Sequence, residues 1–98
     1  MEFEWDEAKN ERNRQERGFG FDFAAMIFTG HTLEAPDRRR DYGEERIRAI
    51  GMADTVCLAV VFTMRGSTRR ILSAHRASRR DRDVYRATFP DRYPGDPT

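Results

Sequence analysis

The longest apolar run of the chain covers residues 56–62, and it predicts a strand at the centre of a sheet. A continuous valine-rich run of this length is typical of a strand that is buried on both faces. Apolar residues also alternate with charged ones before it and, less regularly, after it. We therefore expect three successive strands, at residues 44–52, 55–64 and 68–76.

Short turns join these three strands. Gly66-Ser67 suits a two-residue hairpin loop with glycine first. Ala53-Asp54 is the candidate for the other hairpin. Both strand pairs should therefore be antiparallel.

Helical spacing is found on both sides of the strands. Residues 7–17 are almost wholly polar and lie between Asp6, a typical N-cap, and Gly18, a typical C-terminal stop. A second, short helix is predicted over residues 21–28, where apolar residues recur every three or four positions. Ser78, with Asp81 three residues later, predicts the start of a last helix.

These elements predict one α+β domain over residues 1–89, with two N-terminal helices, an antiparallel sheet of three to four strands and a C-terminal helix. Residues 30–43 are expected to be a loop, whose charge cluster at 37–41 is either solvated or a mobile substrate clamp. Residues 90–98 contain three prolines and are expected to be a disordered tail.

Composition restricts the chemistry. The single cysteine, Cys57, excludes a disulfide within the chain, and two distant histidines predict neither a metal site nor a cofactor. The apolar run is too short for a membrane span, and the acidic first residues are unlike a signal peptide. We expect a cytoplasmic protein that does not bind membranes.

Charge is distributed unevenly along the chain. Residues 1–37 carry nine acidic and four basic side chains, whereas residues 65–98 carry four acidic and nine basic ones. All but one of the eighteen bases are arginine, the residue best suited to phosphate groups. The basic second half indicates a polyanion partner. The alternative is an ordinary solvated surface.

Two-residue turns would set the register of the sheet, placing Met52 opposite Thr55 and Arg65 opposite Thr68. Arg48 would then lie opposite Ala59, Arg46 opposite Val61, and Val61 opposite Leu72. The apolar face would carry Ile47, Ala49, Leu58, Val60, Phe62 and Ile71, with Glu45, Ser73 and His75 towards its edge. The opposite face would carry Arg46, Arg48, Thr63, Arg70 and Arg76.

Arginines gathered on one face of a sheet repel each other unless an anion lies among them. A nucleic-acid backbone would supply that anion. Alternatively, the arginines pair with Glu44, Asp81 or the acidic first helix. A single bulge would also exchange the two faces beyond it.

Several segments, in order and at matching spacing, resemble the BrnT toxin family over residues 3 to about 86. They are Phe3-Glu4-Trp5-Asp6-Glu7-Ala8-Lys9, Phe21-Asp22-Phe23-Ala24-Ala25, Gly43-Glu44-Glu45-Arg46, Ile50-Gly51-Met52 and Arg70-Ile71-Leu72-Ser73-Ala74-His75-Arg76-Ala77-Ser78. The resemblance implies a RelE-like fold and RNA cleavage that blocks translation. It also implies a BrnA-type antitoxin that neutralises the toxin and binds operator DNA.

The chain departs from the family pattern in two places. Where the family commonly has Lys-His-Gly at the end of the first helix, this chain has Glu16-Arg17-Gly18. Where the family commonly has Ser-Ala-Arg, this chain has Ser73-Ala74-His75. The chain therefore lacks the histidine that the family commonly has in the first helix, and it has another at position 75. Whether a mechanism that uses the first-helix histidine applies to this chain is left open by the sequence.

Cleaving RNA without a metal requires a base for the 2′-hydroxyl, an acid for the leaving oxygen and cations for the phosphate. The candidates are Glu45 as base, which alternatively only pairs with Arg46 or Arg70, and His75 as acid, which alternatively is structural. Arg46, Arg70 and Arg76 are the predicted phosphate clamps. Further RNA contacts are expected from Lys9, Arg48, Thr63 and Tyr85. Lys9 alternatively covers Trp5, and Tyr85 alternatively belongs to the core.

Three functions are compatible with the sequence. The first is a metal-independent endoribonuclease toxin. The second is a catalytically decayed relative that only binds antitoxin or RNA, which the changed end of the first helix favours. The third is a plain nucleic-acid-binding protein without a partner.

Overall fold

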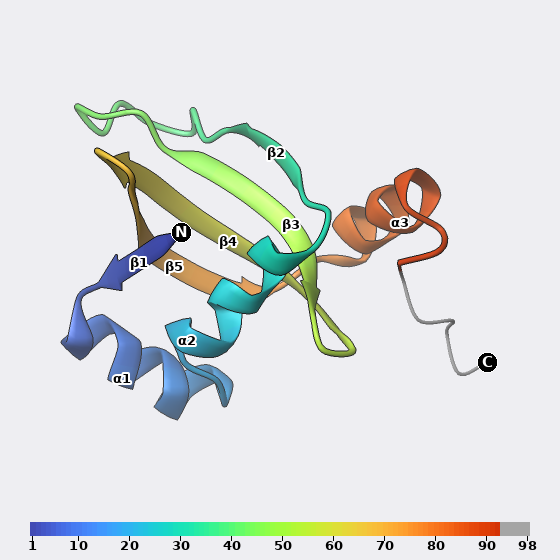
Figure 1. The fold of residues 1–98 in the computed structure, drawn as a ribbon, viewed down its shortest axis with the longest axis horizontal. Coiled ribbons are helices and arrows are strands. Elements are labelled where there is room, and N and C mark those ends of the chain that lie inside the picture. Colours follow the sequence, from blue (N-terminus) through green and yellow to red (C-terminus); the bar gives the residue numbers. More distant parts are fainter. Residues whose placement is uncertain (93–98) are drawn as a thin grey trace.

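The computed structural model describes residues 1–92, and its elements confirm the α+β class. The strands are β1 (Glu2–Trp5), β2 (Leu33–Pro36), β3 (Ile47–Ala53), β4 (Val56–Arg65) and β5 (Thr68–Arg76). They form one sheet in the order β1-β5-β4-β3-β2 (Figure 1). The predicted tail falls largely outside the described residues, and only its first three residues, which form a turn, are seen.

The expected antiparallel sheet of three to four strands was wrong in two respects. The sheet has five strands, and β1 pairs with β5 in parallel, whereas the other pairs are antiparallel. Both additional strands are four residues long and lie at the sheet edges. Such short edge strands depend on partners far away in the sequence, and β2 lies in the region that was expected to be a loop.

The helices begin and end as their caps predict. Helix α1 (Glu7–Arg17) starts at Asp6, whose carboxylate accepts a bond from the Lys9 amide, and ends at Gly18 in the left-handed conformation. The second predicted helix divides into α2 (Phe21–Ala24) and the 3₁₀ helix η1 (Ala25–Thr29). Helix α3 (Arg79–Thr88) starts at Ser78, whose hydroxyl accepts a bond from the Asp81 amide.

One face of the sheet carries the main core, beneath α2 and η1. Phe21, Ile27, Phe62 and Ile71 are among its fully buried side chains, and the Phe28 ring meets the Phe62 ring edge-on at 5.3 Å. Polar side chains hold α1 here instead of an apolar stripe. Its only buried residues are two asparagines, at positions 10 and 13, and they bond to the main chain around α2.

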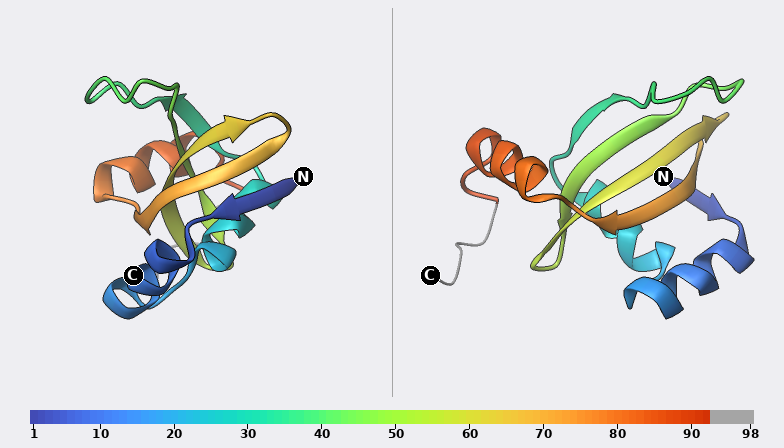
Figure 2. Two further views of the ribbon diagram at one scale, coloured as in Figure 1. Left: turned by 90° about the vertical axis from the view of Figure 1, so that its left-hand side faces the viewer. Right: turned by 180° about the vertical axis from the view of Figure 1, so that it is seen from behind.

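The other face of the sheet is covered by α3 at one end only. Tyr85 packs there with Ile50, Cys57 and Ala59, and its hydroxyl donates to the His31 carbonyl. Cys57 belongs to this part of the core, and its burial raises the pKa of the thiol to about 11. The views in Figures 1 and 2 show α3 at the opposite end of the molecule from α1.

The first hairpin differs from the predicted register by two residues. Its turn is Asp54-Thr55, with Asp54 in the left-handed region, and Arg48 therefore lies opposite Val61 instead of Ala59. A shift of two residues preserves the alternation of side chains. Arg48 thus remains on the face that was predicted to carry the arginines.

A bulge alters the second hairpin. The pairs Arg65–Thr68 and Thr63–Arg70 form as predicted, but the register shifts between Val61 and Phe62. Ser73, instead of Leu72, lies opposite Val61. Beyond this point the two faces of β5 exchange.

The bulge therefore corrects three placements. Ser73, opposite Val61, lies on the arginine face and not at the edge of the apolar face. His75 lies opposite Ala59 on the arginine face and not at the edge of the apolar face. Arg76 lies opposite Leu58 on the face covered by α2 and cannot join the predicted clamp.

Candidate functional site

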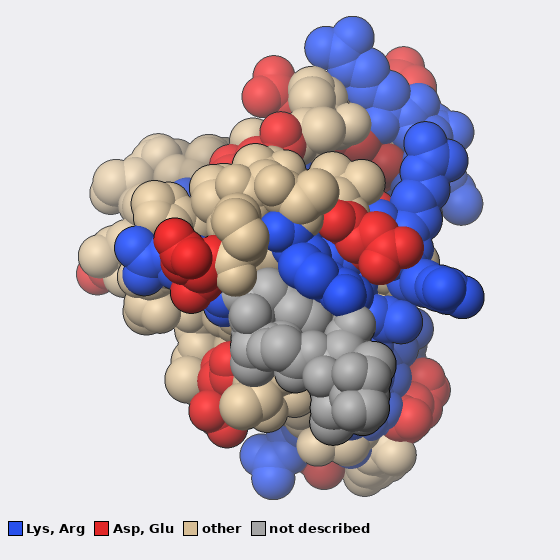
Figure 3. All heavy atoms as spheres, turned by 90° about the vertical axis from the view of Figure 1, so that its right-hand side faces the viewer, with Lys and Arg blue, Asp and Glu red and all other residues tan. Residues whose placement is uncertain are grey.

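Four arginines lie on or beside the sheet face opposite α2, and each holds an acidic side chain. We call them the paired arginines: Arg39 with Asp37, Arg46 with Glu44, Arg48 with Asp81 and Arg70 with Glu4. Figure 3, viewed from the α3 end, shows basic side chains in a band down one side, with acidic ones beside them. The alternative of internal pairing is therefore confirmed for Glu44 and Asp81, whereas Arg70 pairs with Glu4 of β1 and not with the first helix.

The two pairs on the sheet itself join distant elements. Arg48 of β3 holds Asp81 at the start of α3, which fixes that helix over the end of the face. Arg70 of β5 holds Glu4 of β1, with 2.5 Å between Nη1 and Oε2. An arginine has five N–H donors, so each keeps donors that a carboxylate does not use.

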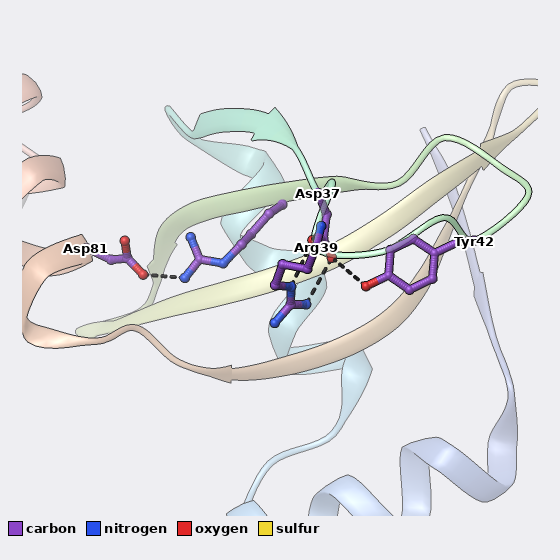
Figure 4. Close-up of polar contacts among 5 residues, drawn as sticks. Asp37, Arg39, Tyr42 and Asp81 are labelled. Carbon is purple, nitrogen blue, oxygen red and sulfur yellow. Dashed lines mark hydrogen bonds and ion pairs between the residues drawn. The ribbon is translucent and has the colours of Figure 1, made fainter.

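The charged loop between β2 and β3 is organised around one buried carboxylate. The Asp37 side chain is only 2% exposed and accepts two bonds of 2.9 Å from Arg39, whose own side chain is 70% exposed. These bonds hold the pKa of Asp37 below its usual value. Tyr42 also donates to Asp37, and its ring lies under the Arg46 guanidinium, 3.9 Å away. Figure 4 shows Arg39 held in front of the strands between Tyr42 and Asp81.

A half-buried imidazole lies on the same face. Burial lowers the pKa of His75 below its usual value, and the positive charges of Arg17, Arg48 and Arg39 lower it further. Asp81 acts in the opposite direction but ranks last among these causes. These influences favour the neutral form of the imidazole, which has a ring nitrogen that can accept a proton.

Arg17 at the end of α1 reaches the same place, and it was not among the site residues predicted from the sequence. Its Nη1 donates to Asn13 Oδ1 at 2.8 Å and to the carbonyl of Ala74, the neighbour of His75, at 3.4 Å. Residues 17 and 75 are distant in the chain, so no local pattern brings them together. The only signal was that both departures from the family pattern involve this pair of positions.

Several predicted site residues lie elsewhere. Glu45 is exposed and lines two clefts, one with Pro36 and Ile47 and one with Tyr42 and Arg46. Its carbonyl accepts a bond from the Thr63 hydroxyl. Its carboxylate pairs with neither Arg46 nor Arg70, which hold Glu44 and Glu4 instead. Thr63 is 5% exposed.

Three further candidates, Tyr85, Arg76 and Lys9, lie in other parts of the fold. Tyr85 is 1% exposed, as expected for the core alternative. Arg76 lines a cleft of about 410 Å³ with Phe19, Phe23 and Val56, on the side of α1 and α2. Lys9 lines a separate cleft between α1 and β5.

Neither a candidate metal site nor a candidate membrane span is found in residues 1–92. No three histidine, cysteine, aspartate or glutamate side chains gather there in a way that could hold a metal ion. None of the helices described there combines the length and apolar character that crossing a bilayer requires.

Comparison with known families identifies the chain. A family described as the ribonuclease toxin BrnT of type II toxin–antitoxin systems matches residues 5–81, which include strands β2 to β5 and only the last residue of β1. No curated protein matches the chain. The match covers most of the domain, including α1, β5 and the start of α3. The chain therefore belongs to the BrnT family of ribonuclease toxins of type II toxin–antitoxin systems.

Proposed function

We propose that this protein is an endoribonuclease that cleaves RNA without a metal, with His75 as its general base. The observation that supports this most is the position of His75, half-buried on the arginine face next to the Arg17 contact at Ala74. Burial lowers the pKa of His75 there, and Arg17, Arg48 and Arg39 lower it further. A neutral base beside cations is what attack by a 2′-hydroxyl requires. His75 thus replaces Glu45 as the proposed base, because Glu45 is exposed near Pro36 and Arg46, whereas His75 is half-buried on the arginine face.

The proposed reaction needs only the RNA and water. The 2′-oxygen loses its proton to His75 and forms a bond to the adjacent phosphorus. The bond from phosphorus to the 5′-oxygen breaks, and that oxygen takes a proton from solvent. The products are a 2′,3′-cyclic phosphate and a 5′-hydroxyl.

The arginines stabilise the negative charge that grows on the phosphate. Arg48 and Arg39 are held in place by Asp81 and Asp37, and their remaining N–H groups can donate to the phosphate oxygens. Arg46 and Arg70 are further along the face and are assigned to binding the RNA backbone. Their exposed acidic partners weaken but do not abolish that attraction.

Cleavage of messenger RNA would inhibit translation, and a BrnA-like antitoxin would neutralise the protein. Operator DNA would be bound only through that antitoxin. These finer assignments rest on membership of the family, which implies an antitoxin partner and an RNA target.

A chelator-containing assay with a fluorogenic RNA tests the proposal. His75→Asn should reduce the cleavage rate by on the order of 10²–10⁴-fold. The matched control is His31→Asn, because His31 is exposed and stacks only on Phe89, and it should keep its rate. Equal rates for the wild type and His75→Asn would rule out His75 as the base.

A decayed module that binds RNA or antitoxin is the second candidate, and the paired arginines favour it. Four cations that already hold internal acids need not act on a substrate. This candidate predicts that the wild type neither cleaves RNA nor arrests growth, although it binds the product of the neighbouring gene.

A further inference from the structure

A cleft of about 200 Å³ lies between α1 and β5, beside the proposed site. We call it the α1/β5 cleft. Helix α1 contributes residues at intervals of three and four, which places them on one side of the helix. The lining residues are Lys9, Arg12, Asn13, Glu16, Arg17, Phe21, Leu72 and Ser73.

The cations of this cleft differ from the paired arginines. Within residues 1–92, no acidic side chain lies within ion-pair distance of Lys9, Arg12 or Arg17. Glu16 is the single acid against these three bases, and it makes no ion pair in the same part of the chain. The cleft therefore has a net positive charge, which Glu16 in its lining and Asp6 near Lys9 reduce but do not cancel.

The edge of β5 connects this cleft to His75. Strand β1 pairs with β5 only as far as Trp5 and Ile71, so β1 does not cover the edge of β5 beyond that point. The bulge lies just there, and it turns Ser73 and His75 to one face. Arg17 crosses this edge, since it lines the cleft and also bonds to the Ala74 carbonyl.

We propose that the α1/β5 cleft binds a phosphodiester group of the RNA next to the one that is cleaved. The strand would cross the uncovered edge of β5 between His75 and α1, with Arg17 at the crossing and Lys9 and Arg12 beyond it. This proposal rests on the proposed function, because it takes the scissile phosphate to lie at His75.

The absence of internal partners makes these cations effective for an incoming phosphate. A phosphate that binds one of the paired arginines competes with a carboxylate that is already in place. A phosphate at Lys9 or Arg12 displaces only water and counterions. Arg17 is also held rigidly by Asn13, which is 4% exposed, so less freedom is lost when the phosphate binds.

The test measures binding and cleavage separately. Binding uses a short RNA with a 2′-O-methyl group at the cleavage position, which cannot be cut, over a series of salt concentrations. The variant is Lys9→Ala with Arg12→Ala. The matched control is Arg14→Ala, on the same helix but lining the other cleft.

We expect the double variant to bind the RNA at least tenfold more weakly. Its logarithmic salt slope should be smaller by about 0.7 for each phosphate that the variant no longer binds. KM for cleavage should rise in parallel while kcat changes less than threefold, and the control should match the wild type. Unchanged affinity and salt slope would overturn the proposal, as would a fall in kcat without a change in binding.

The design separates this proposal from the proposed function. A wild type that cleaves RNA, with a double variant that binds as well as it does, overturns the cleft alone. A wild type that binds the methylated RNA through the cleft but cleaves no RNA overturns the catalytic assignment. In that case the cleft is an RNA-binding surface, but it does not lie beside a phosphate that the protein cleaves.

Discussion

The paired arginines and the cations of the α1/β5 cleft have the same charge but different surroundings. The paired arginines each hold a carboxylate. Arg39 and Arg46 hold acids of their own loop, whereas Arg48 and Arg70 hold acids of α3 and β1. In the cleft, Lys9, Arg12 and Arg17 hold none within residues 1–92. The first group is fixed in place by its acids and keeps part of its attraction for a ligand, whereas no acid competes with a ligand for the second.

The number of arginines on a surface is therefore a poor guide to whether that surface binds phosphate. A cation that is held by an internal acid is fixed in place, and part of its attraction for a ligand is cancelled. A cation without an acid attracts more strongly but needs another contact to fix it. Arg17 pairs with no acid within residues 1–92 and is still fixed in place, because it donates hydrogen bonds to the Asn13 side chain and to the Ala74 carbonyl.

The largest expected effect comes from exchanging the two residues where the regions meet. Arg17→His and His75→Arg should each lower the cleavage rate by on the order of 10²-fold or more. The double variant again has one imidazole and one guanidinium at these neighbouring positions. It should therefore cleave RNA at least tenfold faster than His75→Arg alone. A histidine at position 17 and an arginine at position 75 are the residues that the family commonly has there.

Initial rates for the four proteins of this cycle provide the measurement. Strong non-additivity is expected because the two side chains act together. A double variant whose loss is the product of the two single losses would show that the residues act independently.

A smaller effect separates the two groups through stability. Asp37→Asn removes the charge from a buried carboxylate that accepts two bonds from Arg39, and should lower the free energy of unfolding by about 2 kcal/mol. Arg12→Ala in the cleft should change it by less than about 0.5 kcal/mol. Urea unfolding of both variants checks this. Equal losses would remove the distinction between structural and available cations.

The sequence predicted most of the fold because its signals are local. The caps at Asp6 and Ser78, the central strand and the Gly66-Ser67 turn all depend on neighbouring residues, and all are present. The short strands β1 and β2 were not predicted as parts of the sheet, because they are stabilised by pairing with residues far away in the chain. Glu4 of β1 pairs with a residue 66 positions away, and Glu34 of β2 pairs with a residue 15 positions away.

The site was harder to predict, because one bulge decides it. A single extra residue near Leu72 moved His75 to the arginine face and Arg76 away from it, and no residue type marks that position. The error of two residues in the first hairpin did no harm, since side chains alternate with a period of two. The nearness of Arg17 to His75 follows only from the packing of α1 against β5.

The pH dependence of cleavage tests which cations lower the pKa of His75. Because burial and three arginines lower the pKa of His75, the neutral base should already predominate below pH 6.5. The rate should rise tenfold per pH unit on the acidic side and become constant above that pKa. Arg17→Ala should move the midpoint to higher pH, whereas Arg12→Ala should not. A midpoint above 6.5 in the wild type would contradict the assignment of His75 as base.

The smallest effect concerns an arginine that belongs to neither group. The Arg69 guanidinium lies 3.9 Å from the Phe28 ring and 4.6 Å from the Phe62 ring, on the core face, and its buried Nε makes no hydrogen bond within residues 1–92. Arg69→Met loses the attraction between cation and ring but removes the unsatisfied donor, and these contributions are of similar size. The free energy of unfolding, measured with heat and with urea, should therefore change by less than about 1 kcal/mol, and RNA affinity should not change. The control Arg69→Lys keeps the charge but loses the flat stacking surface, so it should be the less stable of the two. A loss above about 2 kcal/mol in Arg69→Met would show that stacking on aromatic rings fixes an arginine as firmly as a carboxylate does.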